Sequence, residues 1–404
     1  MTTKTRQLAT VAAVCLMLAP TAALADVKLG ALYGVTGPIA SFIPPIADAS
    51  NLAIDQVNAQ GGILGGQTLS LVIGDTQCAP QSSIDAATTL VNVEGVVAIA
   101  GALCSGATMG AAGAVAIPQG VPMLSSASTS PQITGLDDND YVFRVAPSDA
   151  YQGEVVAKYV LDSGITSVAL TFVNNDYGVG LASAFRDAYT AMGGAITADQ
   201  VHEQQKSSYR SELATLSSGS PQALVLFAYA ADSGITMVRQ SLENGFFDTF
   251  VGADSMKDNA LIEAIGADNL QNMYVTSPTS LPDTDGSAVF TEAFTGAYDS
   301  DVSSLFVPQS YDAVFMLALA IEQAGSTDRA AVRDALRLIG DGEGESIGPG
   351  EWSKAVELIA AGTAIDYNGA SGPHDFDAAG DVPGVIGEFK IQDNVWVETG
   401  ILTK

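Results

Sequence analysis

The sequence is poor in the residues that most enzymes use for acid–base and metal chemistry. Its 404 residues include only two histidines, His202 and His374. These lie far apart and have no partners at metal-ligand spacing, so neither a zinc site nor a Ser–His–Asp triad is indicated. Gly-x-Ser-x-Gly, P-loop and dinucleotide-binding fingerprints are also absent. We therefore expect no enzymatic activity, no cofactor and no metal, and keep an exported hydrolase as a remote alternative.

Basic residues are scarce as well. Lys and Arg number 16 against 45 Asp and Glu, which gives a formal net charge of −29. So acidic a chain argues against nucleic acid and anionic membranes as partners. It does not show that the ligand is a cation, because surface charge of this sign also serves solubility. The acidic runs Asp137–Asp140 and Asp375–Asp381 lack the EF-hand pattern and are expected to be solvated loops.

The sequence has no long apolar run, and the apolar stretch near its N-terminus is short. Lys4 and Arg6 precede the apolar stretch Val11–Leu18, and Ala23-Leu24-Ala25 matches a small-residue cleavage site. This pattern predicts a signal peptide over residues 1–25, with Asp26 as the new N-terminus. The apolar stretch is too short to span a bilayer as a helix. We therefore expect the chain to be exported.

Cysteine is rare too, and removal of the signal peptide leaves only Cys78 and Cys104. An even pair in an oxidising compartment favours a disulfide. Such a bond would close a loop of about 25 residues and stabilise the fold by about 3 kcal/mol. Two buried free thiols are the alternative.

What the sequence does contain is a regular alternation of strand-like and helix-like stretches joined by short loops. Apolar, β-rich segments alternate with segments whose apolar residues recur at helical spacing. Such alternation predicts α/β architecture with doubly wound parallel sheets. The pattern restarts after Arg144–Pro147, so a second α/β lobe begins near residue 147. The expected strands are Val27–Tyr33, Leu69–Gly74, Val96–Gly101, Val121–Leu124, Ser167–Val173, Ala223–Tyr229 and Phe250–Ala253.

Polar residues follow several of these strands where each strand ends. Cys104–Thr108 and Ser125–Ser130 supply hydroxyls and N–H groups, which suit a carboxylate. Asn174–Gly180 supplies Tyr177, and Asp254 adds an acid that could neutralise a cationic group. Ligands of parallel α/β sheets bind at the carboxyl ends of strands. Each segment could instead simply cap its own helix, but together they suggest a site for a zwitterion.

Several longer motifs resemble one family, the type I periplasmic solute-binding proteins of ABC transporters, in their leucine/isoleucine/valine branch. The similarity covers nearly all of the chain after residue 25. The motifs are GVTGPIASF, VNAQGGILGG, GDTQCAP with ALCSGAT, PMLSSASTSP, NNDYGVG, FVGAD and VPQSYDAVFMLALAIEQAG.

The resemblance implies two α/β lobes joined by three crossovers that act as a hinge. Lobe 1 would comprise residues 26–146 with 278–367, and lobe 2 residues 147–277 with 368–404. The crossovers would fall near Ala146–Ser148, Ser277–Ser280 and Tyr367–Gly372. A disulfide between the two cysteines, a periplasmic location, a monomeric state and an ABC permease as partner are further expectations of the family.

The family also implies roles for individual residues. Ser105 and Thr129 would hold a ligand carboxylate, Ser128 and Thr129 would also meet its ammonium group, and Asp254 would complete the ammonium site. Phe42, Tyr177 and Tyr311 would wall the side-chain pocket.

This chain departs from the leucine binders in having Asp254 where they usually have Glu. It also lacks a tyrosine near Ala230–Ala231, unless Tyr229 substitutes, and has a longer insertion over residues 341–366. The expected ligand is a small zwitterionic, aliphatic amino acid. A short amide, urea or carboxylate is the alternative, and an acidic surface protein without a small ligand is the third hypothesis.

Overall fold

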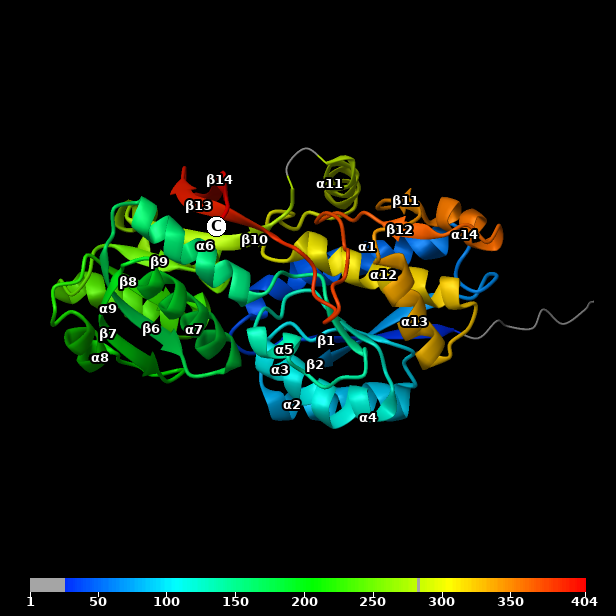
Figure 1. The fold of residues 1–404 in the computed structure, drawn as a ribbon, viewed down its shortest axis with the longest axis horizontal. Coiled ribbons are helices and arrows are strands. Elements are labelled where there is room, and N and C mark those ends of the chain that lie inside the picture. The colour runs from blue at the N-terminus through cyan, green and yellow to red at the C-terminus, as the bar shows by residue number, and fades with distance from the viewer. Residues whose placement is uncertain (1–25, 282–283) are drawn as a thin grey trace, which may run out of the picture.

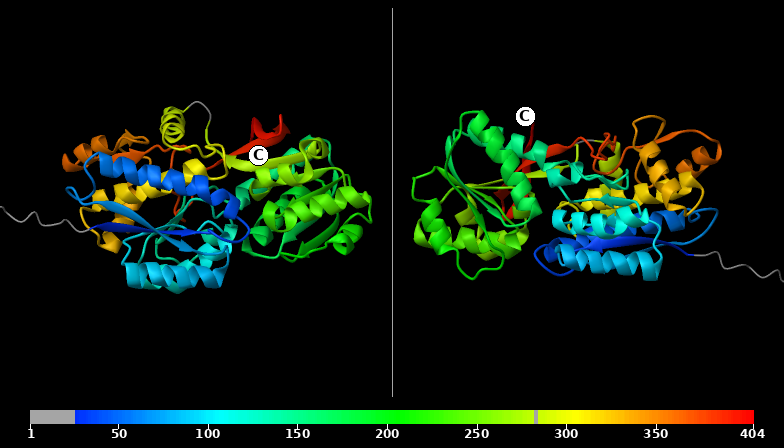
Figure 2. Two further views of the ribbon diagram at one scale, coloured as in Figure 1. Left: turned by 180° about the vertical axis from the view of Figure 1, so that it is seen from behind. Right: turned by 60° about the horizontal axis from the view of Figure 1, so that its bottom comes forward.

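The chain folds around two separate β-sheets, as a computed structural model of residues 26–281 and 284–404 shows (Figure 1). The predicted signal peptide lies outside the described residues. We refer to the first sheet with its helices as lobe 1 and to the second as lobe 2. The two lobes lie side by side along the longest axis of the molecule (Figure 2). The predicted α/β class with parallel sheets is confirmed.

Lobe 1 is built on five parallel strands in the order β2-β1-β3-β4-β5. Its central strands are buried on both faces, which explains their short, continuously apolar sequences. Gly101 ends β3 with a φ of +113°, and a Cβ there would lie 2.6 Å from the carbonyl oxygen of Leu32. Only glycine fits where this strand turns towards the Cys104 loop. The strands are β1 (Val27–Tyr33), β2 (Leu69–Asp75), β3 (Ile99–Gly101), β4 (Met123–Ser125) and β5 (Val142–Arg144).

Helices cover both faces of this sheet. In Figure 1, α1, α12 and α13 lie on one side and α2, α3 and α4 on the other. A further two-stranded sheet, β11 with β12, and helix α14 make up the insertion near residue 350. The elements are η1 (Ala40–Phe42), α1 (Ile43–Ala59), α2 (Pro80–Thr89), η2 (Leu90–Glu94), α3 (Ser105–Ala111), η3 (Ala112–Ala116), α4 (Ile117–Gln119), α5 (Pro131–Thr134), α11 (Asp285–Ala297), α12 (Val307–Ala324), α13 (Arg329–Ile339), β11 (Glu345–Ile347), α14 (Trp352–Ala360) and β12 (Ile365–Tyr367).

Lobe 2 contains a seven-stranded sheet in the order β14-β13-β10-β9-β8-β6-β7. Strands β6 to β10 are parallel, and the C-terminal hairpin β13–β14 adds antiparallel to β10. The strands are β6 (Ser167–Val173), β7 (Ala195–His202), β8 (Ala223–Phe227), β9 (Phe250–Gly252), β10 (Met273–Thr279), β13 (Val385–Gln392) and β14 (Val395–Leu402). The helices are α6 (Asp149–Asp162), α7 (Asp176–Ala191), α8 (Arg210–Leu216), η4 (Ala230–Gly234), α9 (Ile235–Asn244), η5 (Asp254–Met256), α10 (Asn259–Ile265) and η6 (Ala267–Leu270).

Alternate residues of these strands pack into different cores. Val225 and Phe227 of β8 join the cluster that includes α6 and α7, whereas Leu224 and Leu226 join the cluster with α8, α9 and α10. This division follows from the alternation of side chains along a strand. Both faces of the sheet are therefore covered, and its free surface is limited to the strand ends and edges.

The chain passes between the two sheets three times, and the third passage differs from the prediction. The first follows β5, as expected. The second follows Thr279, which still pairs with β13 and lies inside the predicted range Ser277–Ser280. In the third, the amide of Ala370 donates to Asp312 of α12, so the chain past residue 368 still packs on lobe 1.

The acidic run Asp375–Asp381 is not a fully solvated loop. Asp381 is 9% exposed and receives hydrogen bonds from both Nε and Nη2 of Arg144, at 2.5 and 2.7 Å. Arg144 itself is fully buried at the end of β5. This ion pair holds the run against lobe 1, so we place the third passage at residues 382–385.

Candidate functional site

The loops that follow the parallel strands meet around a cavity between the lobes. As the lobes stand in this structure, its free volume is about 30 Å³, well below the range of about 300–1,000 Å³ for small-molecule pockets. Lobe 2 contributes Tyr177, Tyr229, Asp254 and Ser255, and lobe 1 contributes the rest of the wall. The residues from lobe 1 are Ile39, Phe42, Ile46, Leu103, Cys104, Ser105, Ala127, Leu305 and Phe306.

Ser105 stands at the first position of α3, directly after the disulfide cysteine. Cys78 and Cys104 are bonded, with their Cα atoms 5.3 Å apart, so the pairing expected from the sequence is confirmed. The bond ties the loop after β2 to the start of α3. Ser105 is 2% exposed, and its hydroxyl accepts a hydrogen bond from the amide of Ser130 at 3.2 Å. A hydroxyl donor is thus fixed on the lobe 1 side of the cavity.

Asp254 supplies negative charge on the opposite, lobe 2 side. It opens η5, separated from the end of β9 by one residue, and its Oδ1 accepts a hydrogen bond of 2.6 Å from the hydroxyl of Tyr177. Burial raises the pKa of Asp254 to about 6, although the Tyr177 bond lowers it. Burial and the charge of Asp254 raise the pKa of Tyr177 well above its usual value. Tyr177 therefore stays protonated and donates to the carboxylate.

A second buried carboxylate, which the sequence reasoning missed, belongs to Asp149 at the start of α6. Its Oδ2 accepts a hydrogen bond of 2.8 Å from the Thr129 hydroxyl, and its Oδ1 has no hydrogen-bond partner among the described residues. Burial, together with the charge of Asp254, raises the pKa of Asp149 well above its usual value. Two mutually repelling carboxylates thus lie close to the cavity, where a positive group would relieve both.

Ser128 and Thr129, two of the predicted site residues, are buried but do not line the cavity. The Ser128 hydroxyl lies 2.6 Å from that of Thr108 and donates to the carbonyl of Ala102 at 3.0 Å. Thr129 is occupied with Asp149, as described above. Their loop approaches the cavity through Ala127 instead.

Tyr311, the third predicted aromatic, lies elsewhere. Its ring packs against Phe290 and Phe315 in the core of lobe 1, with centroids 5.2 and 5.5 Å apart. Its hydroxyl donates to Gln56 and accepts from the amide of Gly350 at 2.9 Å. Because α12 is buried on nearly every side, the sequence pattern could not show which of its faces points towards the cavity. Tyr311 is therefore not part of the site we propose.

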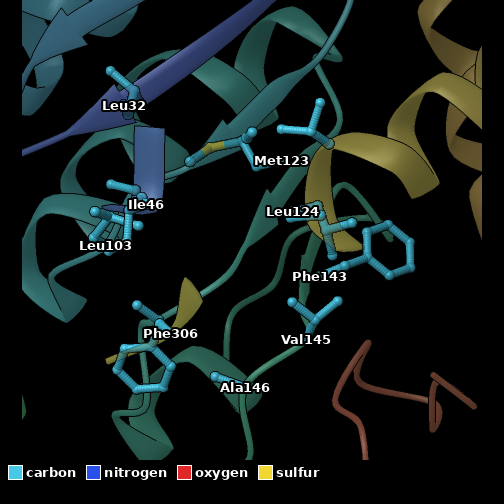
Figure 3. Packing of buried hydrophobic residues seen from close by; sticks show 14 of the residues in the cluster. Leu32, Ile46, Leu103, Met123, Leu124, Phe143, Val145, Ala146 and Phe306 are labelled. Atoms are coloured by element: carbon cyan, nitrogen blue, oxygen red, sulfur yellow. The ribbon is translucent and has the colours of Figure 1, made fainter. Parts of the chain in front are cut away.

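Leu305 and Phe306 occupy this wall instead. Phe306 has a φ of +58°, a left-handed conformation that is rare for a residue with a side chain. It places the ring on the cavity together with Ile46 and Leu103, which are shown among the buried residues in Figure 3. No sequence signal marked this conformation. Among the predicted residues, Phe42, Ser105, Tyr177 and Asp254 do line the cavity.

Tyr229 resolves one question that the sequence left open. It lines the cavity, with its ring centroid 5.4 Å from that of Tyr177. An aromatic residue is therefore present on this side, although none stands at Ala230–Ala231. The two tyrosines extend the wall next to Asp254.

The two histidines serve elsewhere in the structure. His202 lies between Thr171 and Ser233 in lobe 2, and burial lowers its pKa to about 4, so it is neutral. His374 lies next to Asp312 in lobe 1. Within residues 26–281 and 284–404, no cluster of three His, Cys, Asp or Glu side chains suits a metal ion. Over the same residues, no helix combines the length and the apolar character needed to cross a membrane.

Two α/β lobes that enclose a cavity at the carboxyl ends of their sheets define a bilobed solute-binding protein. The comparison with protein families agrees with this class: the family model described as periplasmic binding protein matches residues 26–382. The chain belongs to this family, whose members bind solutes and are not enzymes.

Known relatives cover most of the chain. It is 28% identical over 312 residues to a leucine-, isoleucine-, valine-, threonine- and alanine-binding protein of Pseudomonas aeruginosa, covering 77% of this chain and 82% of the relative. It is 27% identical over 334 residues to a leucine-specific-binding protein of Salmonella typhimurium, covering 82% and 88%. A leucine binding protein from Thermotoga maritima has the same fold, with a TM-score of 0.80 at 23% identity over 93% of this chain and 99% of that one.

The fold alone does not fix the ligand. A solute-binding protein of R. palustris solved with benzoate aligns with a TM-score of 0.75 at 19% identity, over 93% of this chain and 96% of that one. The identity of the solute must therefore be argued from the cavity itself.

Proposed function

We propose that this protein binds a small zwitterionic, aliphatic amino acid between its lobes and delivers it in the periplasm to an ABC permease. The observation that carries the proposal is the composition of the cavity wall. A hydroxyl donor, Ser105, lies on lobe 1, and an acid, Asp254, lies on lobe 2, while most of the remaining wall is apolar. A ligand carboxylate would meet the first, its ammonium group the second, and an aliphatic side chain the rest.

The acids favour an ammonium-bearing ligand over a plain carboxylate. Both Asp149 and Asp254 are buried, and of the described residues that line the cavity, all except Asp254 are uncharged. The charge of Arg144 lowers the pKa of Asp149 but does not offset the burial of this acid, and the guanidinium is bound by Asp381. A ligand that brought only negative charge would add to this repulsion. The relatives named for leucine, isoleucine and valine support the same ligand class.

The mechanism is a population shift. The ligand bridges groups on both lobes only when these are close together, so it stabilises the closed state by its contacts with Tyr177 and Asp254 on one side and Ser105 on the other. Residues 1–25 are proposed to be a signal peptide that directs the chain to the periplasm, and the protein is proposed to be a monomer.

The experiment uses the mature chain from Asp26, unfolded and refolded to remove any bound solute. Thermal shift and calorimetry are measured with leucine, valine, isoleucine and alanine, and with two analogues of leucine, 3-methylbutylamine and 4-methylpentanoate. We expect a zwitterion to raise the melting temperature and both analogues to bind weakly. Short amides and urea complete the panel.

The variant Asp254→Asn tests the ammonium site. Loss of one partner of a buried charge pair costs about 2–5 kcal/mol, so the Kd should rise by about 30-fold or more. Asp248→Asn, an exposed acid in the same lobe, is the matched control and should leave the Kd unchanged. Tight binding of 4-methylpentanoate that is insensitive to Asp254→Asn would instead establish a carboxylate binder.

A further inference from the structure

Two hydrogen bonds join the lobes across a groove next to the ligand cavity. The hydroxyl of Ser41 in η1 donates to Oδ2 of Asp258 at 2.8 Å. The ammonium group of Lys257 donates to the backbone carbonyl of Ser303 at 2.8 Å. Ser41 and Ser303 belong to lobe 1, whereas Lys257 and Asp258 follow η5 in lobe 2. Each bond can therefore exist only while the lobes are together.

Lobe 2 holds both of its groups in place by itself. Oδ1 of Asp258 caps α10 by accepting the amide of Ala260 at 2.9 Å, and the residue is 5% exposed. The Lys257 ammonium lies 4.3 Å from the ring centroid of Phe389 in β13. Groups that are already oriented lose little conformational entropy when they bind. Each of these contacts therefore contributes more free energy to closure than a contact between two flexible surface side chains would.

These residues do not touch the ligand cavity, yet they lie close to it along the chain. Ser41, Lys257, Asp258 and Ser303 line a separate groove between the lobes. Phe42, which follows Ser41, lines both the groove and the cavity. Asp254 lies three residues before Lys257. A ligand that draws Asp254 towards lobe 1 therefore also brings Lys257 and Asp258 to their partners.

We propose that Ser41, Lys257 and Asp258 form an interlobe latch that slows ligand release without taking part in ligand recognition. The proposal rests on the proposed function, because it requires closure of the lobes around a solute. These are positioning residues: they stabilise the closed state, and the ligand is selected by the cavity. The latch should act equally on every ligand that closes the lobes.

The test compares Ser41→Ala, Lys257→Met and the double variant with the wild-type protein. Asp258 is left intact because it also caps a helix. Ligand association and dissociation are followed by stopped-flow fluorescence with leucine, valine, isoleucine and alanine. Lys158→Met and Ser163→Ala, which change a half-exposed lysine and an exposed serine of lobe 2, are the matched controls.

We expect the dissociation rate to rise about 5-fold or more in each single variant, as loss of one hydrogen bond implies. The association rate, the ratio of affinities among the four amino acids and the ligand-free melting temperature should stay as in the wild type. An unchanged dissociation rate in the double variant, or an equal increase in the controls, would overturn the latch. A change in the ratio of affinities would assign these residues to recognition and also overturn it.

A readout without ligand separates this proposal from the proposed function. A nitroxide on Glu263→Cys, on the lobe 2 side of the groove, broadens lobe 1 amide signals only when the lobes are closed. The closed population of the ligand-free protein should fall about 5-fold or more in the double variant, and an unchanged population would refute the latch. If the wild type binds no amino acid, the proposed function fails, and the nitroxide measurement still decides whether the latch exists.

Discussion

Gly180 is the position at which one added methyl group should separate folding stability from ligand affinity. It lies in α7 of lobe 2, and a Cβ there would lie 2.8 Å from Cδ of Pro131 and 2.9 Å from Oγ of Ser130, both in lobe 1. Carbon atoms in contact are normally about 3.5–4.0 Å apart. The variant Gly180→Ala would therefore require α7 to move back by about 0.7–1.2 Å from α5.

The two expected effects have opposite signs. Overpacking of this size costs about 1–3 kcal/mol in the closed state, so the Kd should rise by about 5- to 150-fold. In the ligand-free protein, where the lobes can separate, alanine favours the helix over glycine by about 1 kcal/mol. The ligand-free melting temperature should thus rise by about 2–4 °C.

Calorimetry with the tightest-binding amino acid gives the Kd, and a thermal scan without ligand gives the melting temperature. Gly296→Ala is the control, because that glycine is helical and a Cβ there would meet nothing within 4 Å. It should leave the Kd unchanged. A lower ligand-free melting temperature in Gly180→Ala would refute the reasoning, since it would show that α5 and α7 stay in contact when the cleft is empty. An unchanged Kd would show that ligand binding does not require the close contact between α7 and α5.

Three further predictions follow from the site and its support. Because the pKa of Asp254 is about 6, the Kd should rise about tenfold per pH unit below about pH 6, which calorimetry across pH 4–8 can show. Over the same fall in pH, the contribution of Asp254 to the stability of the ligand-free protein should grow, since the folded state binds this proton more tightly than the unfolded state does. Replacing both Cys78 and Cys104 by Ser should lower the free energy of unfolding by about 3 kcal/mol in urea titrations. Asp381→Asn leaves Arg144 buried with a weakened partner and should cost about 3–5 kcal/mol by the same assay.

The sequence was most informative where the local pattern alone decides the structure. Strands that are buried on both faces, such as Ser167–Val173, could be recognised from their continuous apolar character. The polar segments that follow them, such as the one around Ser105, could be placed at one edge of a sheet from topology alone. The edge strand β7, Ala195–His202, was missed because Thr197, Asp199 and Gln200 interrupt its apolar residues.

The remaining parts of the site depend on tertiary packing. Asp149 resembles any acid in the first turn of a helix, where it is favourable for local reasons. Its significance appears only once α6 places it near Asp254. Phe306 reaches the cavity through a left-handed conformation that propensities disfavour. Tyr311 packs in the core of lobe 1, and the sequence could not show this because α12 is buried on nearly every side. In each case the decisive information lies in contacts between distant parts of the chain.

Closure and selectivity can arise from the same charges in this cleft. In the ligand-free protein, Asp149 and Asp254 repel each other, and the charge of Arg144, which is bound to Asp381, offsets only part of the rise in the pKa of Asp149. Bringing the lobes together dries this region and makes the repulsion more costly. An ammonium group removes that cost, whereas a neutral or anionic solute of the same shape does not. A ligand of the wrong charge should therefore fail at the closing step, even where it fits the apolar wall.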